Sequence, residues 1–295
     1  MRIAFLIVAH KNVEQVNMLL KQLLRYKNSY IFLNIDKKSG ISDDEIIDDS
    51  RVKLYKPRFD VAWGGISQVE VTINLLKMAL ESDLDFDYFS LHSGQDLAIK
   101  PVKEFADFLS KNEGISYMHT GHGQYKEGLL PFPNTIRGGF ERFQLNWPSN
   151  SRSKYGRMKT KLFKLIIVPL FHKGVIKGKA VLPIEFYKGS NWFTLHKSAV
   201  DYIITYLNQN KQYSKMFINS YCCDEIFFHT ILFNSSLKDR IIREDYRYVD
   251  WESGPESPRT LRRDDIDKIS RSGNYFARKF DILIDSDVID EFKDI

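Results

Sequence analysis

Two adjacent cations, Arg278 and Lys279, stand between aromatic residues near the carboxyl end of the chain, in the stretch NYFARKFDILID. Tyr275, Phe276 and Phe280 flank them. An arginine makes a forked contact with two phosphate oxygens and a lysine supplies a point charge, so such a pair could bind a phosphate group. An amphipathic edge with cations outward and aromatic rings inward has the same pattern. The stretch therefore indicates an anion site only if the rest of the chain supplies an anion to bind.

A second stretch, YCCDEIFFHTIL, carries two neighbouring carboxylates, Asp224 and Glu225. We expect Asp224 to be the N-cap of the following helix, where an acidic side chain accepts hydrogen bonds from unpaired amides and favours the helix dipole. Glu225 stands beside the apolar residues Ile226 and Phe227. Partial desolvation at the edge of a cleft would raise the basicity of this carboxylate, which makes Glu225 the candidate general base.

Asp85 and Asp87 match a DxD metal-binding pattern, but they precede the strand expected at YFSLHS. Ligands of open α/β sheets bind at the carboxyl ends of the strands. At that end the chain offers Ser93 and Gln95 of HSGQD instead, so we expect no metal site at the DxD pair. The remaining candidate pairs fit a polar loop or the acidic first turn of a helix. They are His119 and His122, Asp265 and Asp267, and Asp285 and Asp287.

Alternating strands and helices must position these residues. The apolar patterns predict strands over 2–9, 30–36, 52–56, 87–93 and 190–196, and helices over 13–26, 67–82, 102–112, 198–209, 224–234 and 264–272, with long loops over 119–150. This order predicts an α/β fold with a mostly parallel sheet flanked by helices. His10 and Asp36 follow the first two strands and should flank one crevice, although a turn-forming role for Asp36 is an equal alternative. Asn12 with Gln15 should begin the first helix.

Residues 152–179 form a basic insertion with nine Lys or Arg residues and no acid. The cations at 152, 154, 157, 159, 161 and 164 precede the apolar run LIIVPLF. Cations that lead into an apolar segment are typical of a helix lying on an anionic membrane, and the run is too short to span one. A solvated helix followed by a buried strand fits equally well. Few aromatic residues interrupt the stretch, so a nucleic-acid partner is not expected.

Composition narrows the class of protein further. The chain has 295 residues, 43% of them hydrophobic, and a net charge of +5, which is enough apolar material for one large globular domain. The only cysteines, Cys222 and Cys223, are adjacent and cannot build a disulfide framework, which favours a reducing cytoplasm. We expect no signal peptide at MRIAFLIVAH, because His10 and Lys11 stand where a cleavage site should be.

An ordered set of motifs over residues 3–281 resembles the core-2/I-branching glycosyltransferases, the family that also includes the peptide xylosyltransferases. The motifs are AHKNVEQVNMLL, IDKKS, WGGISQVE, FDYFSLHSGQDLAIKP, KGSNWFTL, DEIFFHTIL, YVDW, SPRTL and ARKFD. The resemblance implies a GT-A-type fold and an inverting reaction that needs no metal, because basic residues of the tail neutralise the donor diphosphate. It is weakest over 119–180, where acceptor contacts would be expected.

Residue roles follow from the resemblance by position. The implied donor-binding residues are His10, Asp36, Arg58, Ser93, Gln95, Arg259, Arg278 and Lys279, with Arg278 as a helper. The implied acceptor-binding residues are Ser190, Trp192 and Trp251. Glu225 matches the catalytic base, and no metal ligand or cofactor is implied.

These observations predict one glycosyltransferase domain over residues 1–295. We expect residues 1–115 to bind the nucleotide-sugar and residues 116–295 to carry the acceptor and catalytic half. The expected reaction moves a sugar, with N-acetylglucosamine as first choice, from a UDP-sugar to a glycan hydroxyl, with a lipid-linked acceptor as one candidate. Bacterial surface polysaccharide synthesis at the cytoplasmic side of the membrane is the expected setting. A xylosyl- or glucosyltransferase, or a non-catalytic carbohydrate- or nucleotide-binding module, is the alternative, and the joint presence of Glu225, Arg259 and Lys279 favours an enzyme.

Overall fold

A seven-stranded sheet forms the centre of the computed structural model, which describes residues 1–120, 139–148, 154–251, 253 and 258–295. The strand order is β3-β2-β1-β4-β7-β6-β8. The strands are β1 (Ile3–Ala9), β2 (Ser29–Ile35), β3 (Val52–Leu54), β4 (Tyr88–Ser93), β6 (Ser116–Met118), β7 (Phe193–His196) and β8 (Ile241–Ile242). Only β7 runs against its neighbours in this sheet. The predicted mostly parallel α/β class is confirmed, and the arrangement agrees with a GT-A-type fold.

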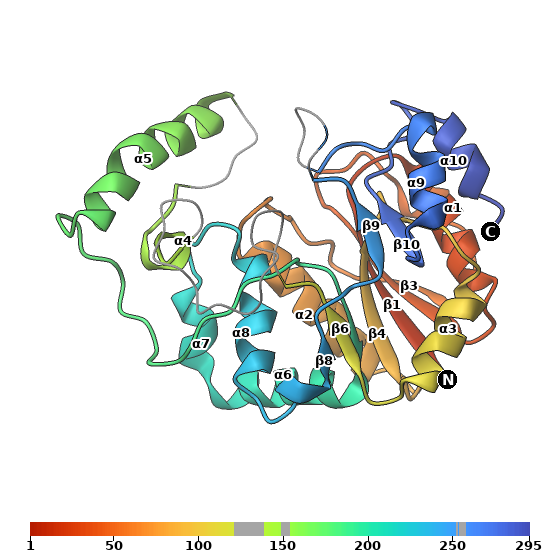
Figure 1. Cartoon of the computed structure of the whole chain (residues 1–295), viewed down its shortest axis with the longest axis horizontal. Coiled ribbons are helices and arrows are strands. Elements are labelled where there is room, and N and C mark those ends of the chain that lie inside the picture. The colour runs from red at the N-terminus through yellow and green to blue at the C-terminus, as the bar shows by residue number, and fades with distance from the viewer. Residues whose placement is uncertain (121–138, 149–153, 252, 254–257) are drawn as a thin grey trace.

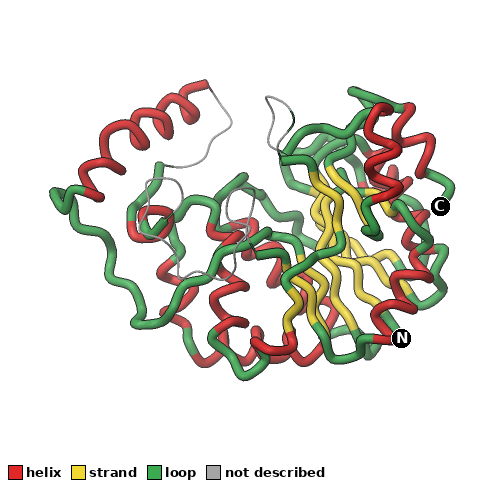
Figure 2. Tube along the Cα trace, in the orientation of Figure 1, coloured by secondary structure: helices red, strands yellow, loops and turns green. Residues whose placement is uncertain are grey.

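Helices cover both faces of the sheet (Figures 1 and 2). The helices are α1 (Val13–Leu24), α2 (Ser67–Leu80), α3 (Val102–Lys111), α4 (Glu141–Gln144), α5 (Lys154–His172), α6 (Lys197–Gln209), α7 (Lys211–Met216), α8 (Phe227–Phe233), α9 (Ile266–Arg271) and α10 (Asp287–Phe292). Side chains of β1 alternate between two cores: Phe5 and Ile7 pack with α1, α3, α9 and α10, whereas Leu6 packs with α2, α6 and α8. A strand buried on both faces explains the continuous apolar run of residues 2–9.

A second, three-stranded sheet places the carboxyl-terminal tail beside the end of β4. Its order is β5-β10-β9, with β5 (Leu97–Ala98), β9 (Arg247–Val249) and β10 (Phe276–Arg278). β10 pairs antiparallel with β5, which follows the turn after β4, and parallel with β9. The cation pair of the tail thus begins on a strand anchored next to HSGQD. Sequence patterns did not predict this sheet, because each strand is only two or three residues long.

Two buried glutamines of α1 tie the tail to the body. Gln15 donates to the carbonyls of Gly94 and Phe280, both at 3.2 Å, and accepts from the Ile282 amide at 3.0 Å. Gln22 donates to Phe292 O at 2.6 Å and lies near β5. A helix beginning at Asn12 was predicted, and Asn12 is the N-cap residue of α1, but its side chain does not cap the helix amides. Asn12 is in the left-handed region (φ 54°) and donates to Asp281 at 2.8 Å instead.

The basic insertion contains one helix, α5, that continues through Pro169. The predicted buried strand at LIIVPLF is therefore wrong. Proline has no amide hydrogen, so the carbonyl of residue 165 lacks its helical hydrogen bond. Because Leu165 is exposed, water can donate a hydrogen bond to that carbonyl. Most of the loop predicted over 119–150 lies outside the described residues; 141–144 is helical. No helix in the described part of the chain is both long and apolar enough to cross a bilayer.

Candidate active site

A buried carboxylate, Asp96, lies in the turn that follows β4 and gathers cations around it. Ser93 Oγ donates to it at 2.9 Å. Arg247 Nε lies 3.2 Å from one carboxylate oxygen and Arg278 Nε lies 3.5 Å from the other. The side chain of Asp96 is 0% exposed and that of Arg247 is 2% exposed. Asp96 thus holds β9, β10 and the end of β4 together through charge.

The electrostatics of this cluster are set by burial and by its two arginines. Burial alone would raise the pKa of Asp96, but the nearby Arg278 and Arg247 outweigh it and hold the pKa well below its usual range. Burial, followed by the charge of Arg247, lowers the pKa of His92 to about 4, so this ring is neutral at neutral pH. Burial lowers the pKa of Arg278 to about 10, which leaves it charged.

Trp192 covers the same two guanidinium groups. Its ring centroid lies 3.9 Å from Arg278 Cζ and 5.3 Å from Arg247 Cζ, a cation–π geometry. Ser190 Oγ accepts from the Trp192 amide at 3.3 Å, and Ser190 itself is buried. Ser190 and Trp192 were predicted to bind the acceptor. In this structure Ser190 is buried and the half-buried Trp192 packs against the tail arginines. The acceptor-binding roles of both residues remain predictions.

Hydrogen bonds tie the segment that carries Lys279 to Gln95 and to the segment that carries Arg259. The Phe280 amide donates to Gln95 O at 2.9 Å, and Gln95 Nε2 donates back to Phe280 O at 3.1 Å. The Leu261 amide donates to Lys279 O at 2.8 Å. These bonds place the segment that carries Lys279 next to the segment that carries Arg259, at the carboxyl end of β4. The half-buried Lys279 is therefore positioned by backbone bonds on both sides.

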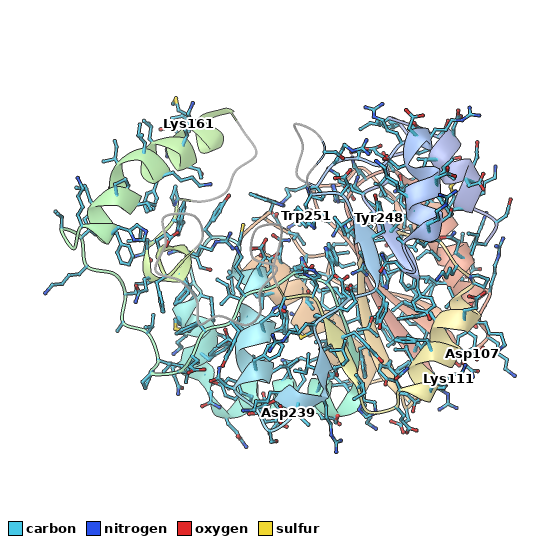
Figure 3. All side chains as sticks on the ribbon, in the orientation of Figure 1. Asp107, Lys111, Lys161, Asp239, Tyr248 and Trp251 are labelled. Atoms are coloured by element: carbon cyan, nitrogen blue, oxygen red, sulfur yellow. The ribbon has the colours of Figure 1, made fainter. Side chains whose placement is uncertain are left out.

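Arg259 is held by two carboxylates. Its Nε donates to Asp250 at 3.0 Å and its Nη2 pairs with Asp265. Burial opposes the charge, but the hydrogen bonds that Arg259 donates to Asp250 and Asp265 outweigh it and raise the pKa of Arg259. Asp265 is also the N-cap of α9, which agrees with its predicted helix-start role. Trp251, a predicted acceptor residue, follows Asp250 directly and is half-buried near the end of β9 (Figure 3).

His10 and Asp36 lie at neighbouring strand ends, as predicted, because Ala9 pairs with Ile35 across β1 and β2. The Asp36 amide donates to Ala9 O at 2.8 Å, and its carboxylate accepts from the Lys38 amide at 2.9 Å. The structure therefore gives Asp36 the turn-forming role that was the alternative to a nucleotide contact.

The Arg58 guanidinium already contacts two groups of the protein. Its Nη1 donates to Ile41 O at 2.7 Å and its Nη2 pairs with Asp43. The hydrogen bond from Arg58, and then the one from Lys56, lowers the pKa of Asp43. The donor-binding role of Arg58 remains a prediction.

Glu225 lies between two cations that its apolar sequence neighbours, Ile226 and Phe227, did not predict. Arg142 Nη1 is 2.6 Å and Lys188 Nζ is 3.7 Å from the same carboxylate oxygen. The side chain of Glu225 is 23% exposed. Its carbonyl accepts from the Gly189 amide at 2.8 Å. A Cβ at Gly189 would lie 2.2 Å from His119 O, so only glycine fits at this position.

Asp224 is not the helix cap that its position predicted. It lies within the 3-10 turn Cys223–Glu225, whose N-cap is Cys222, and α8 begins two residues after that turn. Asp224 is buried, and its Oδ1 has no hydrogen-bond partner. Burial, and then the charge of Glu225, raises the pKa of Asp224 above its usual range.

The DxD pair lies away from these groups, at the amino end of β4. Asp87 accepts from the Arg2 amide at 2.7 Å and Asp85 pairs with Lys197. The expectation that this pair holds no metal ion remains a prediction. Of the two histidines considered as metal ligands, His122 lies outside the described residues. Within the described ranges no group of three His, Cys, Asp or Glu side chains could hold a metal ion.

Sequence reasoning missed Asp96, Arg247, Arg142 and Lys188 as site residues. Asp96 ends HSGQD, the motif singled out at the end of β4, so its position carried a signal. The other three come from loops and short elements whose spacing carries none.

Polar side chains gather at the carboxyl ends of the parallel strands, which is where open α/β sheets bind their ligands. The profile of the family described as Core-2/I-Branching enzyme matches residues 3–129 and 140–272. The chain therefore belongs to the Core-2/I-branching enzyme family.

The curated relatives are glycosyltransferases by name. Xylosyltransferase sqv-6 of Caenorhabditis briggsae is 23% identical over 95% of this chain and 35% of its own length. Xylosyltransferase 1 of Rattus norvegicus is 22% identical over 98% of this chain and 34% of its own. The chain thus spans about a third of the length of the curated relatives it matches. A solved putative glucose-1-phosphate thymidylyltransferase from Bacillus anthracis matches 68% of this chain and 74% of its own at 10% identity, but its TM-score of 0.32 is too low to add to the fold assignment.

Proposed function

We propose that the chain is a metal-independent, inverting glycosyltransferase that moves a sugar from a UDP-sugar to a glycan hydroxyl. The observation that carries this proposal is the docking of the tail: backbone bonds hold Lys279 beside Gln95 and the Arg259 segment, at the strand ends where α/β proteins bind nucleotides. Family membership supports the reaction class. N-acetylglucosamine is our first choice of sugar, and bacterial surface polysaccharide synthesis is the proposed setting.

The proposed reaction is a single displacement. The acceptor hydroxyl oxygen forms a bond to the anomeric carbon while the bond from that carbon to UDP breaks, and UDP leaves with the electron pair. Glu225 takes the hydroxyl proton. Lys279 and Arg259 neutralise the charge that develops on the diphosphate, which a divalent ion does in many other enzymes. Asp250 and Asp265 hold the Arg259 guanidinium in place for this role.

A xylosyl group is the second candidate, because the curated relatives are named xylosyltransferases. A panel of UDP-sugars in EDTA tests the proposal. The preferred donor should raise the melting temperature and should be hydrolysed slowly without acceptor. Protection without any hydrolysis or transfer would favour the non-catalytic binding module, and no protection by any UDP-sugar or by UDP would contradict the proposal.

A further inference from the structure

Helix α5 has two apolar faces, and among the described residues only one of them packs against the rest of the protein. On the inner face, Phe163, Ile167 and Phe171 pack with a small core that includes Trp147 and Leu145. On the outer face, exposed apolar side chains recur along the helix. They are Tyr155 (62% exposed), Met158 (51%), Leu162 (48%), Leu165 (71%) and Ile166 (52%). At 3.6 residues per turn these five fall within an arc about 100° wide, the width of a face that normally packs against a core.

Cations border this outer face on both sides. Lys159 and Lys161 are exposed and stand at opposite edges of the arc, and Lys173 and Lys177 are exposed beyond the helix. The sequence has no Asp or Glu from residue 142 to residue 184. The side chains of residues 154 and 157 are outside the described part of the chain, as is residue 152. The described cations alone therefore make the outer face apolar in the middle and positive along its edges.

The helix lies at the periphery, away from the central sheet (Figure 1). Lys161 on α5 and Lys111 on α3 lie at opposite sides of the molecule (Figure 3). A flat partner could therefore approach the outer face of α5 without meeting the sheet or the helices that cover it.

We propose that the outer face of α5 binds the surface of an anionic lipid bilayer. An apolar strip edged by lysines suits this partner, because the strip inserts among the acyl chains while the lysines contact negative headgroups. An unbroken absence of acids over 43 residues would be unnecessary for most protein partners, whose surfaces carry both signs of charge, but it matches a surface of uniformly negative charge. The helix would lie in the plane of the bilayer.

The inner face of α5 connects this surface to the candidate base. Lys164 Nζ donates to Tyr221 Oη at 3.2 Å, and the Tyr221 amide donates to Arg142 O at 2.7 Å. Arg142 in turn contacts Glu225 at 2.6 Å. A bilayer bound to α5 would thus lie on the side of the molecule that carries Glu225. If the proposed transferase function holds, an acceptor carried on a lipid would be presented near its base.

Flotation of the full chain with vesicles tests membrane binding without measuring sugar transfer. A negative result would therefore contradict the membrane proposal and leave the proposed transferase function untouched. The vesicles are phosphatidylcholine alone or with phosphatidylglycerol. We expect binding to the anionic vesicles at low salt, and release at high salt because screening shortens the reach of the lysines. Lys159→Gln with Lys161→Gln should lower the partition coefficient by about 25-fold, or about fivefold per cation. Leu165→Gln with Ile166→Gln should lower it at least about tenfold.

Lys103→Gln with Lys111→Gln on α3 is the matched control, since it removes the same charge from the far side of the molecule. It should leave flotation unchanged. Absence of flotation at low salt, or equal losses from the α3 and α5 lysine pairs, would overturn the proposal. A second copy of the chain could bind to this apolar face instead of a bilayer. Sedimentation velocity tests for such a dimer. A dimer that the Leu165 and Ile166 changes dissociate, together with no vesicle binding, would also overturn it.

Discussion

Two groups of charged side chains in this protein have similar composition and opposite settings. Asp96 with Arg247 and Arg278 is almost wholly buried, with each charge facing a partner. Glu225 with Arg142 and Lys188 also joins one carboxylate to two cations, but about a quarter of each of Glu225 and Lys188 is exposed. A buried, paired group holds chain segments together, whereas a partly exposed carboxylate can reach a substrate. The comparison favours a positioning role for Asp96 and is compatible with the proposed role of Glu225 as the base.

The largest effect that we expect is the loss of sugar transfer when the Glu225 carboxylate is replaced. Glu225→Gln keeps the shape but cannot accept the hydroxyl proton, so sugar transfer should fall about 10²- to 10⁴-fold while UDP affinity stays near the parent value. Initial rates and UDP binding by calorimetry measure the two quantities. Asp224→Asn is the control, because Asp224 is the buried neighbour. If Asp224→Asn abolished transfer and Glu225→Gln did not, the base would be Asp224.

Asp96→Asn tests the positioning role. Loss of the carboxylate leaves Arg247 and Arg278 buried without their shared partner, and breaking a buried pair in this way costs about 3–5 kcal/mol. Urea unfolding should show this decrease in the free energy of unfolding. Asp107→Asn, in the exposed pair with Lys103, should change it by no more than about 0.5 kcal/mol. Equal changes at the two sites would break the comparison.

His92, which lies in the buried group around Asp96, should make the free energy of unfolding depend on pH. Its folded pKa is about 4, whereas an unfolded histidine titrates near about 6.5. As the pH falls, the unfolded chain takes up this proton first, so the stabilisation is complete above about pH 6.5 and declines toward pH 4. The share due to His92 is at most about 3 kcal/mol. His92→Asn should flatten the free energy of unfolding between pH 6.5 and 5; an unchanged slope there would contradict the assignment.

The smallest expected effect compares the two buried glutamines of α1. Gln15→Ala and Gln22→Ala should each cost about 1–3 kcal/mol, because each leaves buried backbone groups without a partner. Gln15 bonds the segment beside Lys279, whereas Gln22 bonds Phe292. Only Gln15→Ala should also weaken UDP binding in the folded protein. If the two variants bound UDP with equal affinity, the docking of the tail by Gln15 would not contribute to donor binding.

The long elements of this fold could be predicted from the sequence because their patterns are local. The apolar run of β1 and the periodicity of α2 and α6 each specify an element without distant partners. The placement of His10 and Asp36 at neighbouring strand ends follows from the parallel sheet.

The parts that could not be predicted depend on distant contacts. β10 is three residues long and owes its position to the distant strand β5, with which it pairs at Phe276–Ala98 and Ala277–Leu97. Arg142 and Lys188 reach Glu225 from separate loops, so the apolar neighbours Ile226 and Phe227 gave a false impression of its setting. Asp224 looked like a helix cap because the 3-10 turn that contains it has no sequence pattern of its own.

The most direct test of the account is sugar transfer in excess EDTA, comparing the parent chain with Lys279→Ala. If the docked tail supplies the charge that UDP needs, the parent should keep its activity in EDTA, and Lys279→Ala should lose UDP affinity and turnover that added magnesium or manganese does not restore. Full dependence of the parent on a divalent ion would contradict the account and would return attention to Asp85 and Asp87.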